Sequence, residues 1–177
     1  MAEPRIRPVE CRLRPLGSWL IFARFPYPIP MKKTIFALAA LLAPFALAED
    51  AKVELTSNDQ MQYNLKTFEV TAGDKVTLTF KHIGQLPKVA MGHNVVILQA
   101  ATPLPDFAMK ASTAKDHDYI PQDAESQAKI VAHTKLIGGG ESDTITFTAP
   151  AAGSYPFLCT FPGHFAVMQG TMTVKAK

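Results

Sequence analysis

Three side chains that bind soft metal ions lie close together near the C-terminus. Cys159, His164 and Met168 follow one another with the spacing Cys-x4-His-x3-Met. A thiolate and a thioether favour copper, and imidazole suits copper as well. Zinc accepts cysteine and histidine, but methionine is not among its usual ligands. The segment therefore predicts most of a copper site, one imidazole short of a trigonal His-Cys-His arrangement with a weak axial methionine.

The missing imidazole must come from another part of the chain, and His93 is the candidate. It lies in the segment Met91-Gly92-His93-Asn94 and directly precedes an apolar run that favours a β-strand. Taken alone, each residue of this set has an ordinary alternative. Cys159 would be an inert buried thiol, His93 a structural histidine, His164 a surface loop histidine and Met168 a core residue. Their joint spacing favours the metal site over these alternatives.

Residues 31–48 carry the pattern of a secretory signal peptide. Lys32 and Lys33 precede an apolar run from Ile35 to Leu47, which ends in the motif Ala-Leu-Ala. The run is too short to span a membrane. We expect cleavage near Ala48, a periplasmic location for the domain formed by residues 49–177, and no membrane insertion after cleavage.

Residues 1–30 precede this signal, although a signal peptide acts at the N-terminus of a chain. We interpret Met31 as the true start and residues 1–30 as an upstream start assigned too early. The alternative is a genuine disordered leader. Nothing in these residues has the pattern of a folded element.

The expected mature segment, residues 49–177, is mildly acidic. It contains eleven lysines, no arginine and thirteen aspartates and glutamates, for a formal charge of −2. Without a basic cluster, nucleic-acid binding is excluded. Cys159 is its single cysteine, so an internal disulfide is excluded too. A lone thiol in an oxidising compartment is a liability unless it is buried or bound to a metal, which again favours Cys159 as a ligand.

Short alternating segments separated by turn residues predict an all-β fold. We expect a Greek-key β-sandwich of seven to eight strands, with a short helix near 106–115 on an excursion over residues 101–120. The expected strands lie at 52–57, 68–70, 75–82, 93–99, 129–132, 143–148, 154–159 and 170–175. A sandwich of this kind commonly brings distant strand ends to one pole, where His93 would meet the loop after Cys159.

Beyond the ligand spacing, the chain resembles the azurins, which are blue-copper proteins of the cupredoxin family. The resemblance covers nearly all of residues 50–177. The motifs that carry it are Ser57 to Asn64, Leu86 to Lys88, Met91 to Asn94, Ala132 to Gly138 and Cys159 to Met168. It implies a single copper that cycles between +1 and +2. Its strong ligands would be His93, Cys159 and His164, and its weak axial ligands Met168 and the carbonyl of Gly92.

The resemblance also implies how the site works. Asn94 and Thr160 would brace the two ligand segments by hydrogen bonds near the sulfur. The protein would be a monomeric periplasmic one-electron carrier and not an enzyme. Its partners would be redox proteins such as c-type cytochromes and a periplasmic reductase or oxidase. They would dock at an apolar surface around His164 formed by Met61, Leu86, Ala90, Met91, Phe161, Pro162 and Val167.

The chain departs from the azurin pattern in four places. Asp50 and Asp74 lie roughly where azurins have a disulfide, and Val95 replaces a core tryptophan. Phe165 follows the second histidine, where azurins usually have a small residue. The segment 101–118 matches poorly and is longer. We expect lower thermal stability from the missing disulfide and a changed surface near the copper from Phe165.

Three other functions compete with electron transfer. A periplasmic copper carrier or buffer would use the same ligands and is the main alternative. A multicopper oxidase or nitrite reductase needs further histidine clusters, and the five histidines here include no His-x-His pair. A structural zinc domain is disfavoured by Met168.

Overall fold

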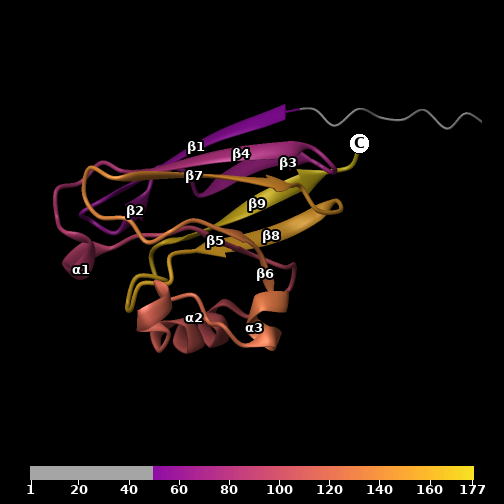
Figure 1. The fold of residues 1–177 in the computed structure, drawn as a ribbon. Helices are drawn as coiled ribbons and strands as arrows, with labels where there is room; N and C mark the ends of the chain where they lie inside the picture. The colour runs from indigo at the N-terminus through magenta and orange to yellow at the C-terminus, as the bar shows by residue number, and fades with distance from the viewer. Residues whose placement is uncertain (1–49) are drawn as a thin grey trace, which may run out of the picture. The chain divides into compact units, whose positions relative to one another are not determined.

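The computed structural model describes residues 50–177, so the leader, the signal peptide and the cleavage near Ala48 lie outside the described residues. Two β-sheets form the described domain (Figure 1). The first has the strand order β2-β1-β4-β7, with β1 Asp50–Asn58, β2 Gln62–Tyr63, β4 Lys75–His82 and β7 Ser142–Thr148. The second has the order β3-β9-β8-β5-β6, with β3 Thr67–Thr71, β5 Val96–Leu98, β6 Ile130–His133, β8 Gly153–Leu158 and β9 Gln169–Lys175.

This arrangement confirms the predicted β-sandwich and adds one strand to the predicted seven or eight. The extra strand, β2, has only two residues and pairs antiparallel with the end of β1. A pair that short leaves no alternation in the sequence, so the pattern does not reveal it. Most neighbouring strands are antiparallel, but β1 pairs parallel with β4, and β3 pairs parallel with β9.

The main core lies between the two sheets. Leu55, Leu78 and Phe80 of the first sheet and Phe157 and Met172 of the second are fully buried there. Alternate residues of a strand face opposite sides of a sheet. In both sheets, therefore, the inward positions carry the apolar side chains that the alternation predicted.

The continuous apolar run at residues 95–98 is buried on both faces of its sheet. Val95 and Ile97 belong to the core between the sheets, whereas Val96 and Leu98 belong to a second cluster under the helices. Helix α2, Leu104–Ser112, covers that outer face with Phe107 and Ala108 (Figure 1). A strand covered on both faces has no polar alternation, which explains the run.

The excursion between β5 and β6 holds more helix than predicted. Besides α2, it contains a 3-10 turn at Lys115–His117 and helix α3, Ala124–Ala128, whereas only one short helix near 106–115 was predicted. Helix α2 begins at Leu104, two residues before the expected residue 106, and Pro105 lies in its first turn, where proline is tolerated. Asp123 caps α3, where its carboxylate accepts from the backbone N–H of Ser126 at 3.1 Å.

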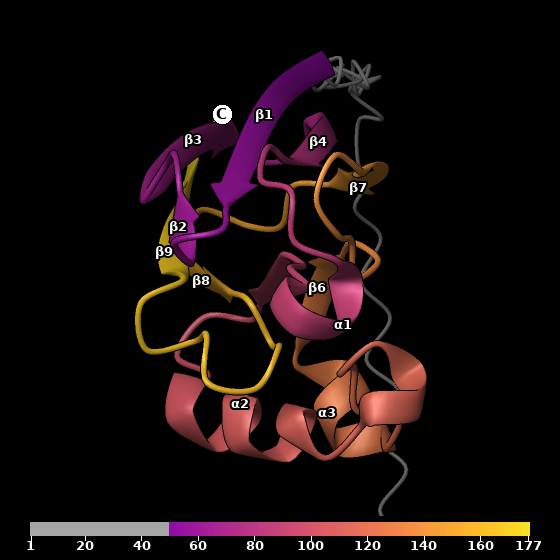
Figure 2. The ribbon, with the colours of Figure 1, turned by 90° about the vertical axis from the view of Figure 1, so that its left-hand side faces the viewer.

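The loop between β8 and β9, residues 159–168, lies at the same end of the sandwich as helix α1, Lys88–Met91 (Figures 1 and 2). The turn between β1 and β2 also lies at this end, opposite to the C-terminus. The segments that carry the candidate ligands therefore meet at one pole, as predicted. Among residues 50–177, the structure contains no helix of the length and apolarity needed to cross a membrane.

Candidate metal centre

The side chains of His93, Cys159 and His164 converge at this pole. The Cys159 sulfur lies 3.9 Å from Nδ1 of His93 and 3.7 Å from Nδ1 of His164, and the two nitrogens lie 3.2 Å apart. All three residues are buried. Among the described residues this is the one group of histidine, cysteine and carboxylate side chains with a common metal-binding geometry. The structure thus brings together the three residues that the sequence selected.

Hydrogen bonding fixes which nitrogen of His93 faces the group. Nε2 of His93 lies 3.0 Å from the carbonyl oxygen of Asn58, so Nε2 carries the proton and donates to it. In the neutral ring, Nδ1 then keeps its lone pair and points toward the sulfur. A metal-binding histidine commonly has its other nitrogen held in this way.

Backbone pairing delivers His93 and Cys159 to the same place. His93 forms an isolated bridge with Ile137, with backbone hydrogen bonds of 2.9 and 2.8 Å. Three residues further on, β5 pairs with β8 at Val96 and Leu158, and Leu158 directly precedes Cys159. The sandwich positions both ligands through its own hydrogen bonds. A metal-free chain can therefore hold the site in place.

Gly92 and Met168 border the same group. The carbonyl oxygen of Gly92 lies 4.0 Å from the Cys159 sulfur. A Cβ at position 92 would lie 2.6 Å from the carbonyl oxygen of Lys88, so the tight packing of the backbone at the end of α1 requires glycine here. Met168 is fully buried in the core cluster that contains Cys159, and its carbonyl accepts the backbone N–H of Cys159 at 3.0 Å.

The buried side chain of Asn94 ties the two ligand segments together. Its oxygen accepts the backbone N–H of Thr160 at 2.9 Å, and its Nδ2 donates to Oγ1 of Thr160 at 2.8 Å. The same Nδ2 donates to the carbonyl of Asp118 at 3.3 Å. The bracing that the azurin resemblance implied is therefore present beside Cys159.

Burial keeps the three donors uncharged in the metal-free chain. Desolvation lowers the pKa of His93 to about 4, helped by the neighbouring His82 and His164 and opposed by the hydrogen bond to Asn58. Desolvation also lowers the pKa of His164. It raises the pKa of the Cys159 thiol to about 11. At neutral pH both imidazoles are ready to bind, whereas the thiol must lose its proton to a metal.

The depressed histidine pKa values predict that the metal-free protein loses stability in mild acid. Between pH 6.5 and about pH 4 the unfolded chain binds the proton that folded His93 rejects, so stability falls as pH falls through this window. His93 alone accounts for about 3 kcal/mol of that loss, because each pKa unit corresponds to about 1.4 kcal/mol. Urea unfolding of the metal-free protein at pH 7 and pH 4.5 measures it. His93→Gln should flatten the dependence, and an unchanged slope in that variant would contradict the assignment.

Comparison with known proteins identifies this arrangement. Residues 49–175 match the family model for copper-binding proteins of the plastocyanin/azurin family. The chain is also 39% identical, over 148 residues, to the azurin of Pseudomonas aeruginosa, a match that covers 81% of this chain and 98% of the relative. The chain belongs to the plastocyanin/azurin family. Copper is therefore the metal that the cluster of His93, Cys159 and His164 binds.

Other known proteins are also similar to this chain. Outer membrane protein H.8 of Neisseria gonorrhoeae is 44% identical over 131 residues, which cover 72% of this chain and 69% of that protein. The solved structure of reduced auracyanin from Roseiflexus castenholzii is 38% identical with a TM-score of 0.64, and covers 72% of this chain and 98% of its own. An azurin from Methylomonas sp. strain J is 32% identical with a TM-score of 0.61, over 71% of this chain and 98% of its own. Family and cluster together support a blue-copper electron carrier of cupredoxin fold.

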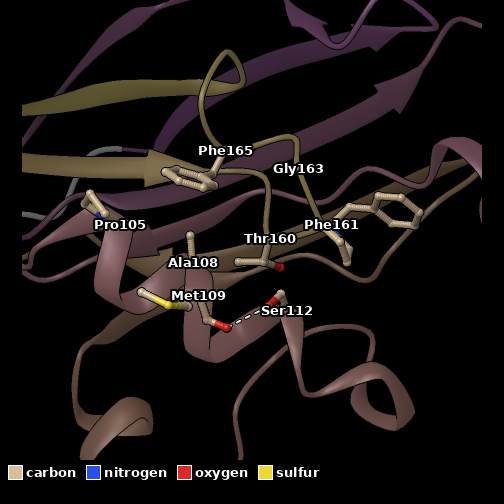
Figure 3. A pocket seen from close by; sticks show the side chains of 9 residues that line it. Pro105, Ala108, Met109, Ser112, Thr160, Phe161, Gly163 and Phe165 are labelled. Carbon is tan, nitrogen blue, oxygen red and sulfur yellow. Dashed lines mark hydrogen bonds between the residues drawn. The ribbon is translucent and has the colours of Figure 1, made fainter.

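Phe165, which departs from the azurin pattern, packs toward helix α2 (Figure 3). Its half-buried ring contacts the outer apolar cluster of Phe107 and Ala108. A pocket of about 390 Å³ remains between α2 and the ligand loop. Its lining residues are Pro105, Ala108, Met109, Ser112, Thr160, Phe161, Pro162, Gly163 and Phe165. Phe165 therefore joins the ligand loop to the excursion. Its expected effect on the surface near the copper stays a prediction.

One contributor to the site, the turn after β1, has no signature in the sequence. Asn58 orients His93 through its backbone carbonyl, and Asp59 lies next to it. A backbone acceptor leaves no mark in the residue type. The azurin resemblance includes the motif Ser57 to Asn64, which contains this turn, but it assigns the turn no role at the copper site.

Proposed function

We propose that residues 49–177 form a periplasmic one-electron carrier with one type 1 copper. The proposed ligands are His93, Cys159 and His164, with Met168 and the carbonyl of Gly92 as weak axial ligands. One observation carries the proposal. The sulfur of Cys159 and one imidazole nitrogen each of His93 and His164 are buried and lie within 4.8 Å of one another. This donor set suits copper better than any other common metal.

The residues around the site support electron transfer rather than metal release. When bound, copper supplies a one-electron couple between +1 and +2. The chain keeps water from Cys159 by burial and holds His93 through Asn58, while Asn94 locks the loop at Thr160. Ligands held by the fold move little when the charge changes, which favours fast electron exchange. In this proposal the protein carries electrons between partners and transforms no substrate, so it is not an enzyme.

The apolar surface around His164 supports a docking role. His164 itself is 4% exposed, and the apolar side chains that we propose to form this surface are half-buried or exposed. They are Met61, Leu86, Ala90, Met91, Phe161, Pro162 and Val167, and we call this surface the His164 patch. Methionine and aromatic surfaces adapt to more than one partner. We propose that a monomer docks briefly here with c-type cytochromes and with a periplasmic reductase or oxidase.

A charge placed on the His164 patch should slow electron exchange without changing the copper site. Val167 is 49% exposed on the ligand loop, whereas Ala152 is exposed in the β7–β8 turn at the opposite end of the sandwich (Figure 1). We expect Val167→Glu to lower the second-order rate of electron exchange with a c-type cytochrome about tenfold, which corresponds to about 1.4 kcal/mol of docking free energy. Stopped-flow mixing measures the rate. Ala152→Glu adds the same charge as a control, and equal rates for the two variants would contradict docking at this patch.

The periplasmic location rests on residues 31–48, which we propose are removed on export. The match to the Pseudomonas aeruginosa azurin covers 81% of the chain, more than residues 49–177 contain, so it reaches into this segment. We expect mass spectrometry of the protein recovered from a periplasmic extract to show a chain that begins near Glu49. A recovered chain that retains residues 1–30 would contradict both the cleavage and the assignment of Met31 as the start.

A further inference from the structure

Asp59, in the turn between β1 and β2, faces the loop that leads from β4 to α1. Its Oδ2 accepts the backbone N–H of Gln85 at 2.8 Å, and its Oδ1 accepts the backbone N–H of Leu86 at 3.2 Å. Nε2 of His82 lies 3.2 Å from the same Oδ1. One carboxylate thus contacts three residues of the segment 82–86, and we call this set of contacts the Asp59 clamp.

The clamp leaves no room for a side chain at position 84. A Cβ on Gly84 would lie 2.2 Å from Oδ1 of Asp59, far inside van der Waals contact. A further hydrogen bond holds the loop, because the backbone N–H of Gly139 donates to the carbonyl of Leu86 at 2.9 Å.

The Asp59 side chain is 22% exposed, so the hydrogen bonds that its carboxylate accepts are partly shielded from water. The hydrogen bond from the backbone N–H of Gln85 is the main cause that holds the pKa of Asp59 below its ordinary value. The backbone N–H of Leu86 and the ring of His82 add smaller contributions in the same direction. The carboxylate is therefore ionised at neutral pH and accepts charge-assisted hydrogen bonds.

Both ends of the clamp lead directly to copper ligands. On one side, Asn58 precedes Asp59, and its carbonyl accepts from Nε2 of His93 at 3.0 Å. On the other side, the loop continues through α1 to Gly92, whose carbonyl faces the Cys159 sulfur at 4.0 Å. The His82 ring packs edge-on against the His93 ring, with centroids 4.5 Å apart. A shift at Asp59 would therefore move both the Asn58 carbonyl, which accepts from His93, and the His82 ring, which packs against His93.

We propose that Asp59 is a positioning residue for the copper site. Its carboxylate fastens the segment 82–86 to the β1–β2 turn, and so sets the orientation of the His93 ring and the position of the Gly92 carbonyl. This role rests on the ligation proposed above for His93 and Gly92. Asp59 itself is not a ligand.

Two variants test this role from opposite sides. Asp59→Ala removes the carboxylate, and Gly84→Ala keeps it but displaces it. The control is Asp123→Ala, because Asp123 also accepts a backbone N–H and pairs with a lysine, but at the start of α3. The readouts are the visible and EPR spectra and the reduction potential of the copper form. A further readout is the exchange rate of the His93 Nε2 proton in the metal-free form, measured by NMR.

We expect Asp59→Ala and Gly84→Ala to shift the EPR copper splitting and the potential, and to speed exchange of the His93 proton at least tenfold. Asp123→Ala should lower the melting temperature alone. If Asp59→Ala and Gly84→Ala also lower only the melting temperature, Asp59 is merely structural and the proposal is overturned. Should Asp59→Ala not fold, Gly84→Ala and Asp59→Asn give the same readouts and decide the question.

The double variant adds a sharper criterion. With alanine at 59, the atoms that the Gly84 Cβ would meet are gone, so Asp59→Ala/Gly84→Ala should match Asp59→Ala alone. Fully additive effects of the two substitutions would overturn the clamp.

The NMR measurement on the metal-free protein separates this inference from the proposed function. Loss of proton protection in Asp59→Ala supports the clamp even if the wild-type protein binds no blue copper, and a blue wild type with unchanged variants overturns the clamp alone.

Discussion

Replacing Cys159 by serine is expected to abolish the blue colour of the copper-loaded protein and leave the metal-free fold intact. The colour of such sites comes from charge transfer between a thiolate and copper, and a hydroxyl supplies no thiolate. The fold should survive because the core between the sheets rests on large side chains such as Phe80 and Phe157. A serine hydroxyl buried at this position costs about 1–3 kcal/mol, which a domain of this size tolerates.

Visible absorption of the copper form and thermal unfolding followed by circular dichroism measure the two effects separately. His133→Gln is the matched control, because His133 lies at the end of β6 outside the cluster and should leave the colour unchanged. A blue Cys159→Ser protein would remove Cys159 from the ligand set. A metal-free variant that fails to fold would show that Cys159 is a core residue rather than a ligand.

Removing the Asn94 side chain is expected to cause the largest loss of stability among the polar substitutions near the site. Asn94→Ala leaves the buried backbone N–H of Thr160 and its hydroxyl without their partners. Each buried polar group without a partner costs about 1–3 kcal/mol, so the expected loss is about 3 kcal/mol. For a domain of this size that corresponds to a fall of roughly 10 °C in the melting temperature. Copper should also dissociate faster, since the segment that holds Cys159 is no longer braced.

Asn64→Ala provides the comparison for this result. Asn64 also accepts a backbone N–H, that of Thr56 at 2.7 Å, but it is exposed, and water can replace the lost hydrogen bond. Urea unfolding of the metal-free variants and a competing chelator for the copper forms give both quantities. A loss in Asn94→Ala no greater than in Asn64→Ala would show that the Asn94 hydrogen bonds do not hold the two ligand segments together.

The parts of the site that the sequence predicts are those encoded by side-chain type. Cys159, His164 and Met168 lie on one loop, so their spacing alone identifies them. His93 precedes an apolar run that forms a strand, and its position at a strand end favours the pole of a sandwich. The apolar run after His93 predicts a strand, and β5 forms there, because continuous apolar residues are typical of strands buried on both faces.

The parts that the sequence does not predict depend on backbone groups and on long-range packing. Helix α1 has four residues, none of them buried, and no side-chain cap, so no periodicity marks it. The Asn58 carbonyl that orients His93 has no signature in the sequence. Gly84 fits against Asp59 across twenty-five positions, and only coordinates show why glycine is needed there. Such contacts fix orientation, whereas the residue types fix chemistry.

The most direct test of the central claim is a redox titration of the copper-loaded wild-type protein, followed by its visible spectrum in the presence of a chelator. The account predicts one copper per chain and an intense blue colour. The colour should disappear on reduction and return fully on reoxidation, with the copper retained throughout. A colourless copper(II) form would contradict a His93, Cys159 and His164 site. Loss of copper to the chelator on reduction would instead indicate a copper carrier or buffer.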